Sequence, residues 1–200
     1  MSQASDRASG EVIQDFLTVA DLLEEPQLAR LYTYLWLEGE ATVRELMDEL
    51  DLPQGSAYTY VNRLTDAGVL EMVTDEQPRM YAAIEIDLTL TVASDQEYTI
   101  TPALIDAVGR RASNEDIDAY LERHGIGGLG TALSYAVGRE QGETTHRLMA
   151  RDLEMSPLEA EIILQALRPV VHDHLEIEKS GVSLSDVLEA ERSSGDSDEA

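Results

Sequence analysis

A stretch without acidic residues, between positions 51 and 66, constrains the fold of this chain more than any other feature. Acidic residues make up 40 of the 200, so a window of this length would be expected to hold about three. Within it, Ala57, Val61 and Leu64 follow the i, i+4, i+7 spacing of a buried helical face. The stretch therefore predicts a helix with one buried face, which ends at Gly68.

The other faces of this predicted helix carry hydroxyl, amide and guanidinium groups, which suit phosphates and base edges. The candidate DNA-contacting residues are Gln54, Ser56, Tyr58, Thr59, Asn62 and Arg63. A solvent-facing surface used for contact with another protein is the alternative. A longer acid-free stretch at 123–139 is mostly apolar and glycine-rich, so burial explains it. The first stretch is polar and needs another reason, which favours a helix that enters the major groove of DNA.

The segments on both sides of this helix complete a winged helix-turn-helix pattern. The expected elements are a helix from Pro26 that ends at Gly39, a short helix opened by the capping box Thr42-Val-Arg-Glu45, the acid-free helix, and two strands at 69–73 and 79–84 joined by a turn. Three helices followed by a hairpin are the order of elements in a winged helix.

The stretch from Glu25 to Ile84 resembles the winged-helix repressors of the ArsR, MarR and TrmB type found in archaea and bacteria. The resemblance covers about 60 of the 200 residues. It implies a DNA-binding domain that acts as a homodimer, with two recognition helices that meet half-sites about one helical turn apart. The residues that carry it are Leu46, Leu50, Leu52, the apolar triplet Ala57, Val61 and Leu64, and the ending Asp66-Ala-Gly-Val-Leu70, in which Val61 stands where the superfamily commonly has a leucine.

Two more arginines are candidates for contact with double-stranded DNA. Arg79 follows the turn of the predicted wing, where it could reach a phosphate or the minor groove. Its alternative is a surface ion pair with Asp75 or Glu76, which would contribute little to stability. Arg44, in the short helix, could support contacts with the DNA backbone.

The net charge of −26 comes from acidic residues spread along the chain, and Lys179 is the only lysine. Such a surface suits a protein that works in multimolar salt, where the Debye length is only about 3 Å at 1 M. We infer a halophilic, archaeal-type host; an acidic protein with basic partners is the alternative. Segment 26–84 has four arginines against ten acidic residues. Specific contacts, rather than general attraction, must therefore provide its affinity for DNA.

Catalytic and metal sites are not expected. The chain has no cysteine, its four histidines do not cluster, and no nucleophile–base pattern is present. The glycine-rich run 125–130 lacks the Lys-Ser/Thr ending of a phosphate-binding loop. No apolar run approaches the roughly 18 residues of a membrane span, and the polar N-terminus lacks a signal core. We expect a cytoplasmic protein without cofactor, metal or membrane contact.

The expected fold is mainly α with a small β-wing. The expected parts are a disordered tail over 1–9, the winged helix-turn-helix over 10–86 with an added first helix at 11–23, a β-hairpin over 87–100, a helical region over 101–191 and a disordered acidic tail over 192–200. In the helical region we expect a cap at Asn114, a break at 124–130, a capping box at Ser156–Glu159, a kink near Pro169 and an end at Gly181.

The helical region or the first helix would supply the dimer interface. An unidentified small-molecule effector would act by changing the separation or tilt of the two recognition helices. Two alternatives stay open: a winged-helix module that binds only proteins, and a small-molecule-binding or enzymatic helical domain to which the winged helix is an appendage.

Overall fold

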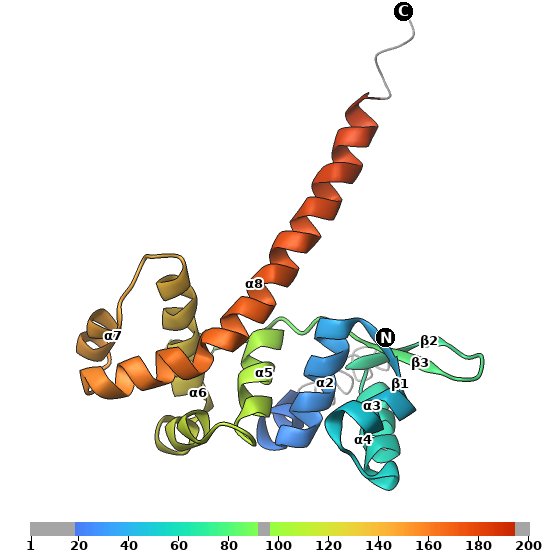
Figure 1. Cartoon of the computed structure of the whole chain (residues 1–200), viewed down its shortest axis with the longest axis horizontal. Helices are drawn as coiled ribbons and strands as arrows, with labels where there is room; N and C mark the ends of the chain where they lie inside the picture. The colour runs from blue at the N-terminus through green and yellow to red at the C-terminus, as the bar shows by residue number, and fades with distance from the viewer. Residues whose placement is uncertain (1–18, 92–96, 195–200) are drawn as a thin grey trace, which may run out of the picture.

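The computed structural model describes residues 19–91 and 97–194, which form a winged helix-turn-helix joined to a helical region (Figure 1). The expected first helix at 11–23 is seen only from residue 19, and residues 19–24 are helical. The rest of that helix and the expected tail 1–9 lie outside the described residues. No helix in the described part is long and apolar enough to cross a membrane.

The winged helix-turn-helix contains the expected three helices and a sheet of three strands rather than two. The helices are α2 (Pro26–Glu38), α3 (Val43–Leu50) and α4 (Gln54–Asp66), and the strands are β1 (Glu40–Thr42), β2 (Leu70–Thr74) and β3 (Met80–Ala83). The sheet is antiparallel in the order β1-β3-β2. Strand β1 was not predicted, because three residues between Gly39 and α3 are too few to show an alternating pattern.

Local signals in the sequence begin and end these helices as predicted. Pro26 is the first residue of α2, and Gly39 ends it with φ 91°. At the start of α3, the Thr42 backbone N–H donates to Glu45 Oε2 at 2.7 Å and the Glu45 N–H donates to Thr42 Oγ1 at 3.3 Å. This reciprocal pair is the expected capping box.

The core of the domain forms where α4 and α2 meet the sheet. Ala57, Val61 and Leu64 of α4 are at most 1% exposed, which confirms the predicted buried face. Tyr32 of α2 is fully buried, and its hydroxyl donates to the carbonyl oxygen of Ile84 at 2.9 Å. Burial raises the pKa of Tyr32 well above its ordinary value. This hydrogen bond fixes α2 to the end of the wing.

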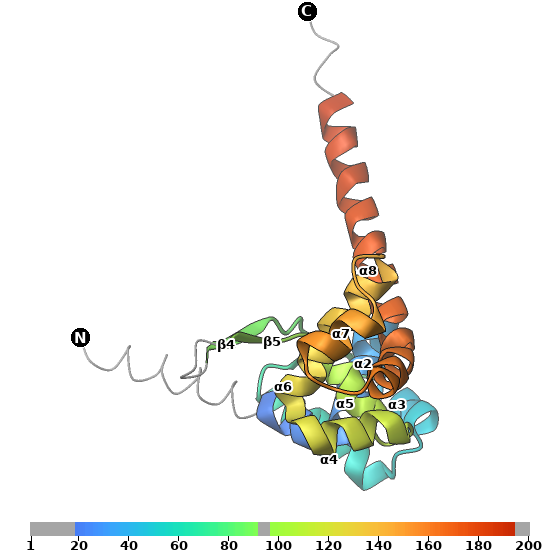
Figure 2. The ribbon, with the colours of Figure 1, turned by 90° about the vertical axis from the view of Figure 1, so that its left-hand side faces the viewer.

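A second, two-stranded sheet and four helices follow the wing. They are β4 (Leu88–Thr91), β5 (Glu97–Ile100), α5 (Pro102–Arg110), α6 (Glu115–Glu140), α7 (His146–Asp152) and α8 (Pro157–Ser194). Strands β4 and β5 form the expected hairpin, and α5 lies against α2, with α6 and α7 beyond it (Figures 1 and 2). Asn114 caps α6 as expected, because its side chain accepts from the backbone N–H groups of Asp116 and Ile117.

Glycine interrupts α6 but not α8. Within α6, Gly125 has φ 68° and ψ −176°, so the expected break is present, although the helix resumes through the following glycines. The expected end at Gly181 is wrong, because α8 continues to Ser194. One glycine costs a helix only about 1 kcal/mol, too little to end a long one. Pro169 lies inside α8, and Figure 1 shows α8 changing direction before its C-terminal part leaves the body.

A buried charge cluster joins α5 to α8. The Asp106 side chain is 5% exposed, accepts from Arg110 Nε at 2.8 Å and Nη2 at 3.0 Å, and lies 3.3 Å from His174 Nε2. Arg110 also donates to Asp173 at 2.6 Å. Burial alone would raise the pKa of Asp106, but the hydrogen bonds from His174 and Arg110 outweigh it and hold that pKa below its ordinary value.

Candidate nucleic-acid interface

Helix α4 presents a polar face on the side opposite its buried residues. Gln54, Tyr58, Thr59 and Asn62 are exposed, and Ser56 is half-buried. Tyr58 is 50% exposed, which is unusual for a large side chain in the middle of a helix. The structure therefore brings most of the predicted contact residues of this helix to one accessible surface.

Hydrogen bonds within the helix occupy part of this surface. The Thr59 hydroxyl donates to the carbonyl oxygen of Gly55 at 2.7 Å, so its oxygen is left as an acceptor. The Asn62 amide can both donate and accept, and amides of this kind bind adenine edges through two hydrogen bonds. Asn62 thus has the chemistry that base recognition needs.

Arg63 behaves differently from its neighbours because acidic residues far away in the sequence bind it. Its Nη2 lies 2.5 Å from Asp21 Oδ2, and its Nη1 donates to Glu25 Oε1 at 2.8 Å. These hydrogen bonds, first that of Glu25 and then that of Asp21, raise the pKa of the guanidinium. The half-buried side chain of Arg63 therefore joins α4 to the segment that precedes α2. Sequence reasoning missed these ion pairs, because Arg63 and Glu25 are 38 residues apart.

The two remaining predicted arginines lie on other elements, Arg79 just before β3 and Arg44 on α3. Arg79 Nη2 lies 3.2 Å from Asp75 Oδ1, the ion pair considered as its alternative role. The side chains of Arg79 and Asp75 are 51% and 77% exposed, so water and salt weaken their interaction and leave Arg79 free to exchange partners. Arg44 is an exposed residue on α3.

The wing adds apolar residues that were not singled out from the sequence. Met72 and Val73 of β2 are 43% and 44% exposed. A regular strand alternates its side chains between two faces and would expose one of these two neighbours rather than both. The register between β2 and β3 shifts between Met72 and Thr74, and this irregularity accompanies the exposure of both side chains.

The four histidines lie among the described residues. Among those residues, no group of three or more histidine and carboxylate side chains could hold a metal ion. Each of the four histidines instead faces a carboxylate: Glu159 for His124, Glu161 for His146, Glu140 for His172 and Asp106 for His174.

Comparison with known families gives two matches in different parts of the chain. Residues 28–87 match the family described as sugar-specific transcriptional regulator TrmB. Residues 111–176 match a family of unknown function, DUF7437. No curated protein and no solved structure matched the chain.

The TrmB match covers α2 to the end of the wing and confirms the predicted resemblance and fold. Residues 28–87 are thus a helix-turn-helix domain of the TrmB type, a family described as transcriptional regulators. The match ends before the hairpin of β4 and β5 and does not reach the helical region.

Proposed function

We propose, from the TrmB-type domain at residues 28–87, that the chain is a sequence-specific transcriptional regulator that binds promoter operators as a homodimer. The observation that carries this proposal is the polar, accessible face of α4, next to a wing, in a domain of a regulator family. In this proposal α4 enters the major groove and the wing lies along the adjacent backbone.

The side chains of α4 divide by chemistry into two groups. Asn62, Gln54 and Tyr58 would contact base edges, because amides form paired hydrogen bonds with adenine and the exposed ring can lie against a thymine methyl group. Ser56 would donate to a phosphate, Thr59 would do so only after its hydroxyl leaves the Gly55 carbonyl oxygen, and Arg44 and Arg79 would add charge at the backbone. Arg63 would contact a phosphate only after leaving Asp21 and Glu25.

We also propose that binding takes place in multimolar salt. A domain with four arginines against ten acidic residues repels DNA in dilute buffer. In molar salt this repulsion is screened over about 3 Å, and the short-range contacts of α4 then decide the affinity.

Helix α8 is the proposed dimer element. Figures 1 and 2 show its C-terminal part extending away from the body of the described chain. Helices gain most of their stability from packing against other elements, so a helix that extends alone favours pairing with a second copy. A dimer would place two α4 helices on half-sites about 34 Å apart, one turn of DNA.

The test is selection of genomic DNA fragments by the full-length protein in molar potassium chloride, with circular dichroism to show that the protein is folded. We expect retention of a small set of fragments with a two-fold symmetric motif and two chains per site. Retention of no sequence above background would contradict the proposal and favour the module that binds only proteins.

Substitutions on α4 locate the contact face. Asn62→Ala and Tyr58→Ala should each weaken binding to the selected site about tenfold, which is the effect of losing one specific base contact. The free energy of unfolding should stay unchanged in both variants. The matched control is Gln141→Ala, which removes an exposed amide at the end of α6 and should leave binding unchanged. Equal binding by all three variants would show that another face contacts DNA.

A further inference from the structure

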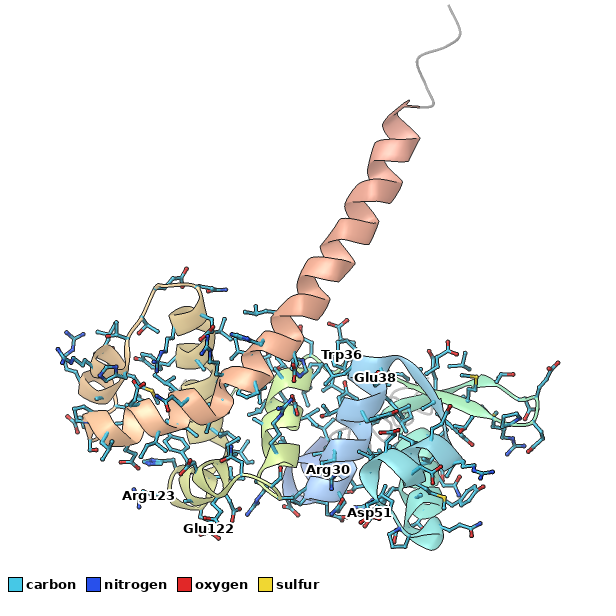
Figure 3. All side chains as sticks on the ribbon, in the orientation of Figure 1. Arg30, Trp36, Glu38, Asp51, Glu122 and Arg123 are labelled. Carbon is cyan, nitrogen blue, oxygen red and sulfur yellow. The ribbon has the colours of Figure 1, made fainter. Side chains whose placement is uncertain are left out.

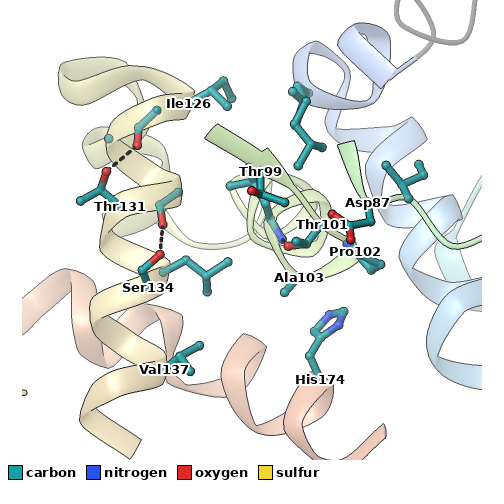
Figure 4. A pocket seen from close by; sticks show the side chains of 18 of the residues that line it. Asp87, Thr99, Thr101, Pro102, Ala103, Ile126, Thr131, Ser134, Val137 and His174 are labelled. Atoms are coloured by element: carbon teal, nitrogen blue, oxygen red, sulfur yellow. Dashed lines mark hydrogen bonds between the residues drawn. The ribbon is translucent and has the colours of Figure 1, made fainter. Parts of the chain in front are cut away.

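A cleft of about 1010 Å³ lies between the winged helix and the helical region. Leu23, Trp36 and residues 85–87, which come directly after the wing, line it from the winged-helix side. Residues 99–104, from β5 into α5, the α6 residues from His124 to Val137, and His174 of α8 complete the lining. Figure 4 shows His174 pointing from α8 toward Thr101 and Pro102, with the Thr131 and Ser134 side chains on α6 across the cleft.

The lining favours a ligand with an apolar body. Apolar side chains outnumber polar ones, and they include Trp36 and Ile126. The two hydroxyls on α6 already donate to carbonyl oxygens of their own helix, Thr131 to Gly127 at 3.0 Å and Ser134 to Gly130 at 3.2 Å. A polyhydroxylated molecule would lose water on all sides and find few free partners, whereas an apolar one gains by burial.

The charges around the cleft favour a cation over an anion. Glu85 and Asp87 line one side, and the lining contains no lysine or arginine. The imidazole of His174 faces Asp106, and that of His124 lies 3.1 Å from Glu159, so both histidines are held by carboxylates. Because Glu85 and Asp87 are exposed, their attraction adds modestly to the apolar contribution.

Residues 21–25, which border the cleft, also form ion pairs with α4, the proposed recognition helix. Leu23 lines the cleft, while Asp21 and Glu25, two residues to either side, bind Arg63 of α4. Asp21 and Glu25 are four residues apart and share one side of the chain, so both ion pairs move with the segment. A ligand that displaces Leu23 would therefore act on the segment that anchors α4.

We propose that the cleft binds a small organic ammonium ion with an apolar body, and that its occupancy is transmitted to α4 through residues 21–25. The binding half stands by itself. The transmission half rests on the proposed DNA-binding function.

Trp36 is the only tryptophan of the chain and lines the cleft, so its fluorescence reports occupancy directly. The probes are 1-adamantanemethylamine, 1-adamantanemethanol and 1-adamantanecarboxylate, which share one apolar body and differ in charge, together with D-glucose. In molar potassium chloride we expect saturable changes with the amine and the alcohol. The amine should bind about fivefold tighter than the carboxylate, and glucose should give no change. No saturable change with the amine, or tighter binding of the carboxylate or glucose, would overturn the proposal.

Three variants place the probe within the cleft. Ser134→Phe should fill part of the space and weaken binding of both the amine and the alcohol. Asp87→Asn should weaken the amine but not the alcohol, while the control Asp48→Asn, an exposed position on α3, should change neither. Amine binding that is indifferent to both Ser134→Phe and Asp87→Asn would place the probe elsewhere and overturn the assignment.

Transmission is measured as operator affinity with and without saturating amine. We expect a change of about fivefold or more, lost in the double variant Asp21→Asn/Glu25→Gln, which still binds the amine by Trp36 fluorescence. The control Asp75→Asn, which releases the wing arginine instead, should keep the response. An intact response in the double variant would overturn the pathway. Absence of any operator binding, with normal amine binding, would count against the DNA-binding function and leave the ligand site standing.

Discussion

Among the described residues, Asp106 is the buried charged residue whose removal should lower the stability of the fold most. Its carboxylate holds Arg110 and His174 and so connects α5, which packs on the winged helix, to α8. Removing one member of such a buried set leaves the others incompletely paired. The cluster thus ties α8 to α5, the helix that packs on the winged helix.

Asp106→Asn should lower the free energy of unfolding at neutral pH by about 2 kcal/mol, because it leaves Arg110 with Asp173 alone. The folded-state pKa of Asp106 lies below its ordinary value, so its stabilisation is complete above the ordinary carboxyl pKa of about 3.9. It is lost as the pH falls through the lower folded-state pKa. Urea unfolding of both proteins from neutral to acid pH should show the difference shrinking only below about pH 4.

The control for this prediction is Asp75→Asn, which removes a carboxylate that is 77% exposed and pairs with Arg79. Its effect should stay within about 0.5 kcal/mol at every pH, as for other exposed ion pairs. A loss in Asp106→Asn that is equal at neutral and acid pH would mean that shape, and not charge, makes this residue important.

For single residues, the sequence predicted which polar side chains are accessible better than it predicted which residues they bind. The amide and hydroxyl groups of α4 were assigned to its accessible faces because helical spacing alone decides which residues face the core. The partners of Arg63 depend on the packing of the segment before α2 against α4, which no local pattern encodes. The same holds for the cleft, whose lining comes from six separate parts of the chain.

Two glycines in helical elements should respond in opposite directions to the same substitution. Gly125 in α6 has φ 68° and ψ −176°, a conformation that is essentially restricted to glycine, whereas Gly55 lies in the first turn of α4. A Cβ at either position would meet nothing within 4 Å, so the difference between them is a backbone effect. The break in α6 therefore depends on glycine for its conformation and not for space.

Gly125→Ala should lower the free energy of unfolding by about 1 to 3 kcal/mol through backbone strain. Gly55→Ala should raise it by about 0.5 to 1 kcal/mol, because alanine is the better helix former. Thermal or urea unfolding of the two variants in the same buffer measures both. A stabilising Gly125→Ala would mean that α6 passes through this position as a regular helix.

Element boundaries followed from the sequence where a local signal decides them, as at Pro26, Thr42 and Asn114. The predicted boundaries were wrong where long-range contacts or the balance of several weak effects decide them. Strand β1 exists because Glu40 to Thr42 pair with β3, a long-range contact, and Gly181 does not end α8 because a glycine is only a weak helix breaker. The break at Gly125 was predicted from a cluster of glycines, but only one of them adopts a non-helical conformation.

For the whole molecule, the net charge of −26 should make folding depend on salt. The labelled acidic residues Glu38, Asp51 and Glu122 lie far apart on the body in Figure 3, so the repulsion is spread over it. Burial, and then the carboxylates of Glu49, Glu38 and Glu45, raise the pKa of Tyr34, a sign of this negative field around α2. Like charges gathered on a compact body destabilise it, and salt screens them.

The midpoint of thermal unfolding should therefore rise steadily as potassium chloride increases from dilute to molar concentration, followed by circular dichroism. Screening by salt is separated from other salt effects with two triple variants. Changing the exposed residues Glu38, Glu40 and Glu49 to glutamine should raise the midpoint in dilute buffer and flatten the salt dependence. Changing the same three to aspartate keeps the charge and should keep the steep dependence. If both variants followed the same steep curve, the salt would act through hydration or apolar burial, and the acidic surface would need another explanation than life in high salt.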